Sequence, residues 1–219
     1  SANKATLEDL QLVVAGATPE ALRLTTSGTV DLARLAADLQ LKLVLGETEG
    51  SGSVKYASLE SPQIDADLSF NLLDPALLVL AGPDAAAAVA EPTADAQGDD
   101  ALPLDALRQV DTRLKLAVTE ARFGEYSAQN LNIALRAVDG LVEIQSLSGD
   151  AIGGSFDLQA TFNGRYNLAT LTSAGEVAGL DLAQALSLAQ IEEDLKGAAT
   201  LGWTVKSQGT SVSGLTEAV

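Results

Sequence analysis

The sequence contains no cysteine and no histidine. These absences exclude disulfides, thiolate and imidazole metal sites, and nucleophilic catalysis of the Ser-His-Asp or Cys-His type. We therefore expect a protein that is not an enzyme and that has no metal site and no cofactor. The lack of cysteine leaves the compartment open, because it suits a reducing cytosol as well as an oxidising space where no bridge is used.

Aromatic residues, basic residues and long apolar runs are also scarce. Aromatics make up 4% of the chain, which disfavours stacking platforms for bases or sugars. Only 13 Lys and Arg stand against 30 Asp and Glu, and the net charge of −17 argues against nucleic acid as a partner. The simplest role of this charge is solubility. No run reaches the roughly 18 uncharged apolar residues of a membrane-spanning helix, and no signal peptide is visible.

What the sequence does contain is a repeated alternation of aliphatic and polar residues. The clearest apolar sets are Leu114, Leu116 and Val118; Leu131, Ile133 and Leu135; and Phe156, Leu158 and Phe162. Side chains of a strand alternate between its two faces, so this pattern predicts a large sheet with one polar and one apolar face.

The alternation predicts eleven strands. They lie near 6–14, 21–33, 37–46, 52–58, 61–72, 112–123, 128–138, 140–148, 153–164, 166–178 and 197–207. We expect turns over 46–53, at Asp139-Gly140 and at Gly153-Gly154. Short helices are expected after Asp74-Pro75, from Pro103, and over 181–194 with Asp181 at its start.

The segment 82–101 divides the sequence into two parts. It carries acidic residues, two prolines and many alanines but no basic residue, and we predict a disordered acidic linker there. The alternative is a short alanine helix inside it. The expected organisation is a β-rich unit over 1–81, this linker, and a second β-rich unit over 102–219 that includes the helix near 181–194.

Two other chemistries would use the acidic residues. Asp65 and Asp67 share one strand face and could form a carboxylate pair, but they lie in the polar phase of a strand and fit a solvated face better. Asp99-Asp100 lacks the ligand spacing of a calcium loop. Tyr56, Tyr126, Tyr166 and Trp203 are interpreted as packing residues.

The second half resembles the C-terminal region of the AsmA family of Gram-negative envelope proteins, which are relatives of TamB. The matching features are a PLDALRQVD helix before a strand, the turn at Asp139-Gly140, the turn at Gly153 and Gly154, and the GLDL opening of a helix. The resemblance covers 102–208 well and 1–81 more loosely. Each motif is degenerate, so the resemblance rests on the order in which the motifs occur.

This resemblance implies a mainly β fold with a few short helices, in which a long antiparallel curved sheet forms a half-pipe or folded groove. It also implies a periplasmic protein of envelope biogenesis, anchored to the inner membrane by an N-terminal helix absent from this sequence. The implied partners are phospholipid acyl chains, bound or transported between the inner and outer membranes. An alternative is a structural or protein-interaction β module without a lipid ligand.

The residues expected to line such a groove are the apolar-phase side chains of the second half. They are Leu114, Leu116, Val118, Leu131, Ile133, Leu135, Val142, Ile144, Phe156, Leu158 and Phe162.

Overall fold

A computed structural model describes most of the chain. The described residues are 4–14, 21–58, 62–73, 104, 108, 111–123, 126–188, 191, 195–211, 214 and 215. The predicted linker 82–101 and the helix predicted after Asp74-Pro75 lie outside this set. Of the helix predicted from Pro103, only Leu104 and Arg108 are described, and both are helical.

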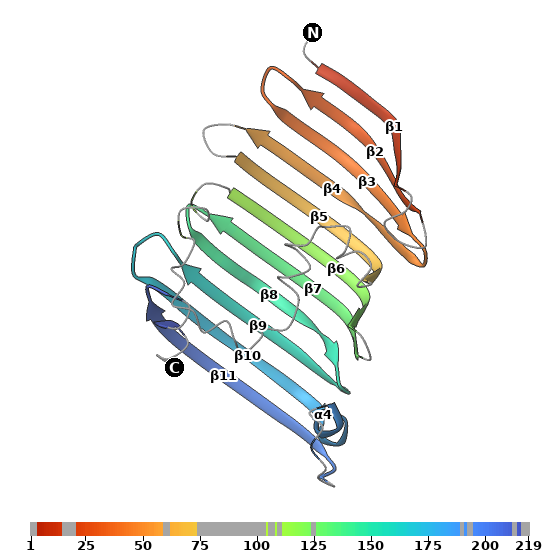
Figure 1. The fold of residues 1–219 in the computed structure, drawn as a ribbon. Coiled ribbons are helices and arrows are strands. Elements are labelled where there is room, and N and C mark those ends of the chain that lie inside the picture. The colour runs from red at the N-terminus through yellow and green to blue at the C-terminus, as the bar shows by residue number, and fades with distance from the viewer. Residues whose placement is uncertain are drawn as a thin grey trace.

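Eleven strands form one open sheet whose spatial order follows the sequence (Figure 1). All eleven predicted strands are confirmed. The strands are β1 (Lys4–Val14), β2 (Leu22–Asp31), β3 (Ala36–Leu45), β4 (Thr48–Ser58), β5 (Pro62–Leu73), β6 (Asp111–Phe123), β7 (Tyr126–Val138), β8 (Leu141–Ala151), β9 (Gly154–Asn163), β10 (Ala169–Asp181) and β11 (Ala198–Gly209).

One junction departs from the expected antiparallel sheet. Nine of the ten neighbouring pairs are antiparallel, but β5 and β6 run parallel. A parallel pair needs a long crossover, and residues 74–110 supply it. The two β-rich stretches of the sequence therefore join in a single sheet through β5 and β6.

The hairpin turns follow local backbone chemistry. Asp139 and Gly140 have φ values of 49° and 74°, as a two-residue turn of this kind requires, and this prediction is confirmed. The turn near Gly153 uses Ile152 and Gly153, with φ values of 52° and 72°. The predicted turn over 46–53 is wrong in extent, because β4 already begins at Thr48.

Gly50 and Gly52 of that segment are in strand β4, where larger side chains of β5 cover them. The ring of Phe70 lies against Gly50, and the side chain of Leu68 lies against Gly52. The turn itself is fixed by Asn71, whose side chain accepts a hydrogen bond from Glu49 N (2.7 Å) and donates one to Glu47 O (2.9 Å). A glycine-rich segment can thus extend where its neighbours fill the missing side-chain volume.

Helix α4 (Leu182–Leu188) begins where the sequence predicted but is shorter. Asp181 caps it, since its Oδ1 accepts hydrogen bonds from Ala183 N (2.9 Å) and Gln184 N (3.2 Å). Ile191 is already non-helical, and its N–H donates to Leu186 O, five residues back. Such a bond satisfies a carbonyl at a helix C-terminus, so the predicted end at 194 is wrong.

Fully buried apolar side chains are few among the described residues. Leu45, Leu72, Val118 and Ala121 lie toward one end of β3–β6, where the ends of β5 and β6 curl over (Figure 1). Toward the other end of the sheet, Arg108 donates two hydrogen bonds to Gly164 O, at 3.0 and 2.8 Å. The strands between these ends have half-buried side chains, so the sheet has a long surface that this small core leaves uncovered.

Candidate functional site

One face of the sheet is apolar across all eleven strands. The register aligns residues that share a face, and two aligned rows define what we call the apolar face. The first row is Leu10, Thr26, Leu41, Gly52, Leu68, Leu116, Ile133, Leu147, Leu158, Gly175 and Trp203; the second is Leu7, Gly28, Leu39, Val54, Ala66, Leu114, Leu135, Ile144, Ala160, Ser173 and Val205.

The structure brings all eleven residues predicted to line a groove onto this face. Six of them lie in the two rows: Leu116, Ile133 and Leu158 in the first, and Leu114, Leu135 and Ile144 in the second. The other five continue it, with Val118 opposite Leu131, Val142 opposite Phe162, and Phe156 opposite Gly149. Val118 is only 2% exposed and belongs to the small core, so it has no surface left to line a groove.

The next row of the register shows how sharply the two faces differ. It contains Thr6, Thr29, Asp38, Lys55, Asp65, Arg113, Arg136, Glu143, Thr161, Thr172 and Lys206, so every strand contributes a polar residue. Neighbouring charges pair along it, with Lys55–Asp38 at 3.5 Å, Arg113–Asp65 at 3.2 Å and Arg136–Glu143 at 2.9 Å. We call this side the polar face.

Among the described elements, nothing forms a second layer over the apolar face. Each strand packs against its neighbours in the sheet, and the only other substantial contact is between α4 and β10. Ordinary sheets cover an apolar face with helices or another sheet. At the two edges the face is fully open to solvent, since Leu10, Leu12 and Leu201 are 54%, 53% and 63% exposed.

Large side chains lie flat across glycines on this face. The indole of Trp203 lies against Gly175, and the ring of Phe156 comes within 2.9 Å of the position that a Cβ on Gly149 would occupy. Trp203 Nε1 also donates a hydrogen bond to Ser173 Oγ (3.3 Å), which satisfies both groups. Trp203 is thus a packing residue, as predicted, whereas Tyr166 is 70% exposed on the β9–β10 loop, so the prediction that it packs is wrong.

Two hydroxyl groups interrupt the apolar character. Thr26 Oγ1 and Ser207 Oγ are buried without a hydrogen-bond partner among the described residues. Thr26 lies in the first row, and Ser207 is opposite Leu171 on the same face. Both lie near the edges of the sheet, on β2 and β11, so the central strands β5–β9 offer an uninterrupted aliphatic surface.

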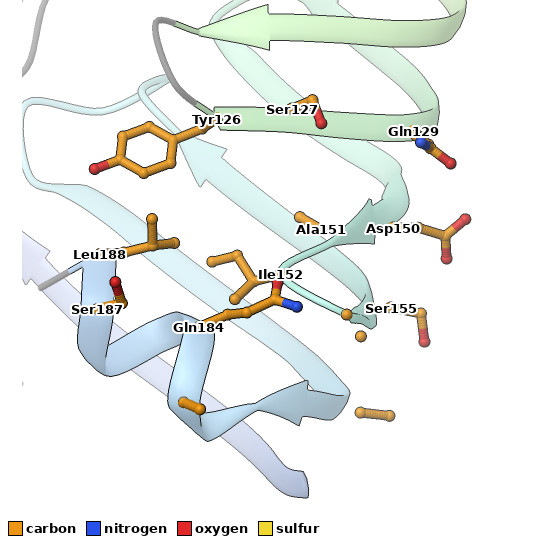
Figure 2. Close-up of a pocket in the computed structure, with 14 residues that line it drawn as sticks. Tyr126, Ser127, Gln129, Asp150, Ala151, Ile152, Ser155, Gln184, Ser187 and Leu188 are labelled. Carbon is orange, nitrogen blue, oxygen red and sulfur yellow. The ribbon is translucent and has the colours of Figure 1, made fainter. Parts of the chain in front are cut away.

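A hollow of about 1020 Å³ lies beside α4, and we call it the α4 hollow. Its walls come from the start of β7, the β8–β9 turn, β10 and α4. Figure 2 shows Tyr126, Ile152, Gln184, Ser187 and Leu188 around the opening, whereas Gln129, Asp150 and Ser155 point away from it.

Of the two other candidate chemistries, the Asp65–Asp67 pair lies within the described residues, whereas Asp99-Asp100 lies outside them. Asp65 is held by Arg113 in an ion pair on the polar face, as the solvated-face interpretation expected. The described part of the chain holds no group of three or more side chains that could ligate a metal, and no helix in it is long and apolar enough to span a membrane. The Arg122 hydrogen bond lowers the pKa of Glu120, but this carboxyl group is exposed near the end of β6.

Sequence reasoning missed apolar-face residues where strands are irregular. Leu147 lies in the first row because Gln145 is an extra residue: Leu135 pairs with Ile144, but Ala134 pairs with Ser146. On β1, Asp9 has a φ of 48° and the register shifts between Leu7 and Leu10. These β-bulges reset the alternation, so a strict period of two does not extend through them.

Comparison with known proteins yields no relative: no family model matches the chain, and no match was found among curated proteins or solved structures.

Proposed function

We propose that the chain is part of an AsmA-like protein of the bacterial periplasm whose apolar face binds the acyl chains of phospholipid on their way between the inner and outer membranes. One observation carries this proposal. The apolar face spans eleven strands, and no second layer covers it among the described elements.

The energetics of such a surface suit an acyl chain. Each methylene that leaves water contributes roughly 0.8 kcal/mol, so a long chain lying along several rows gains substantial affinity without any charged contact. The central rows supply aliphatic side chains such as Leu116, Ile133 and Leu158 that are half-buried and retain surface for a ligand. The polar face, with its ion pairs, keeps the other side of the sheet in water.

Site-specific photocrosslinking tests this proposal on adjacent residues of β9. A photoreactive amino acid at Leu158, on the apolar face, should form adducts with added phospholipid, and one at Gln159, on the polar face, should not. Mass spectrometry of each adduct identifies what was captured. Equal labelling at both positions, or none at either, would contradict the proposal.

A protein-interaction module is the second candidate, and the open sheet edges favour it. Within the described chain, β1 and β11 are each paired with a strand on one side only. An exposed edge can accept a strand from another protein. Protein adducts from photoreactive residues on β1 and β11, without lipid adducts from Leu158, would support this alternative.

A further inference from the structure

We infer that the α4 hollow receives the headgroup of the bound lipid and that it selects headgroups without net charge over anionic ones. This inference rests on the proposed function, because it concerns the headgroup of the same lipid whose acyl chains bind the apolar face. Its first support is position. Ala151 and Gly154 pair two residues beyond Gly149 and Phe156, so the wall of the hollow continues the apolar face past its last large side chain.

The second support is size and composition. A volume of about 1020 Å³ is at the upper end of the range of ligand pockets and can take a glycerol unit with its headgroup. The groups around the opening combine apolar and polar character, with Ile152 and Leu188 beside Tyr126, Gln184 and Ser187 (Figure 2). The hydroxyls of Tyr126 and Ser187 have no partner among the described residues and can donate to ester or phosphate oxygens.

The third support is charge. None of the residues that line the hollow is a lysine or an arginine, and the one acidic residue, Asp150, points its carboxylate away from the opening, where it accepts a hydrogen bond from Asn130 Nδ2 (2.7 Å). An anionic headgroup would enter without a cation to neutralise it, in a chain whose net charge is −17. A zwitterionic headgroup brings its own cation, so the same hydroxyl contacts hold it without that penalty.

The local backbone is built to hold this opening in shape. Ile152 has a φ of 52°, which is unusual for a β-branched residue. Asp181 N donates a hydrogen bond to Ile152 O (3.0 Å), while the Asp181 side chain caps α4. Gly153 allows the close approach, since a Cβ there would lie 3.1 Å from Asp181 Cβ. Asp181 therefore ties the β8–β9 turn to the helix across the hollow.

The test compares dioleoyl phosphatidylcholine with dioleoyl phosphatidylglycerol, which share acyl chains and differ in headgroup charge. We expect the protein to bind the zwitterionic lipid more tightly by about tenfold, because the anionic headgroup enters without a cation to neutralise it. Ser187→Trp should obstruct the opening of the hollow and abolish this preference while acyl binding persists. Tyr126→Phe, which keeps the ring and removes a donor to oxygens that both lipids carry, should weaken the binding of both lipids by about threefold or more.

Ser69→Trp is the matched control, because Ser69 is exposed on the polar face of β5 and should tolerate the same substitution without effect. Equal affinity for both lipids, tighter binding of phosphatidylglycerol, or a preference unchanged in Ser187→Trp together with affinities unchanged in Tyr126→Phe would each overturn the headgroup assignment and leave acyl binding in place. Binding of neither lipid by the unmodified protein would instead overturn the proposed function, and the headgroup assignment with it.

Discussion

Ile133→Asp separates a ligand-binding face from an ordinary core. Ile133 lies near the middle of the apolar face, between Leu116 on β6 and Leu147 on β8, and it is half-buried. If water covers this face in the protein without lipid, a carboxylate at position 133 can remain hydrated. The protein should then fold but bind less lipid.

The magnitude follows from the burial. Full burial of an isoleucine is worth about 1.5–3 kcal/mol, and half of that is lost here together with two cross-strand contacts of about 0.2–1 kcal/mol each. We therefore expect Ile133→Asp to lower the free energy of unfolding by about 1–3 kcal/mol. Val118→Asp on the same face should cost more than about 4 kcal/mol, because Val118 is only 2% exposed and its carboxylate would be desolvated.

Thermal melting and lipid photocrosslinking of these variants check the reasoning. Arg136 lies on the polar face of β7 and forms an ion pair with Glu143. Arg136→Asp would break this pair and place two carboxylates opposite each other, so it is a poor control. Ala117→Asp is better matched, since Ala117 is exposed on the polar face between Ser69 and Asn132. It should change neither stability nor binding much. If Ile133→Asp unfolds as completely as Val118→Asp, the face at this strand is a covered core and the assignment fails.

Three further predictions concern the forces at the apolar face. Lipid binding should change by less than about twofold between low and moderate salt, because an aliphatic surface has no charge to screen, and a steep loss measured in a salt titration would contradict this. Binding should also be flat between about pH 6 and pH 8, since the chain has no histidine to titrate in that range, and a step in a pH series would show that an ionisable group takes part. Gly175→Leu should destabilise the sheet by about 1–3 kcal/mol and shift the fluorescence of Trp203 to the red, because the new side chain collides with the indole. Gly202→Leu is the control and should do neither, since a Cβ at Gly202 has ordinary contact distances.

The fold could be predicted well because its strands obey a simple rule. On β3, Leu39, Leu41 and Leu43 alternate with Asp38, Gln40 and Lys42, and the register leaves this phase unbroken. Alternation is set by local geometry, so strand identity and the phase of each face are visible in the sequence.

What the sequence could not reveal depends on long-range pairing. Nothing local distinguishes β5 and β6 as a parallel pair, because their alternating patterns would suit an antiparallel pair equally well. The sequence also gives no sign of the bulge at Gln145, because the extra residue is an ordinary polar one. The bulge is visible only in the register of β8 with β7 and β9. The α4 hollow needs the β8–β9 turn and the helix to meet, a contact made through the Asp181–Ile152 hydrogen bond across distant segments.

The architecture links stability to occupancy of the apolar face. Among the described elements, each strand packs mainly against its sequence neighbours, so the sheet is stabilised by a series of neighbouring contacts, much as a repeat protein is. The half-buried leucines of the central strands therefore still expose apolar area that a ligand can bury. Any molecule that covers them in the folded state stabilises that state in proportion to its concentration and affinity. Under the proposed function, the acyl chain occupies the position that a second sheet takes in a sandwich, so the aliphatic rows that specify the fold also specify the ligand.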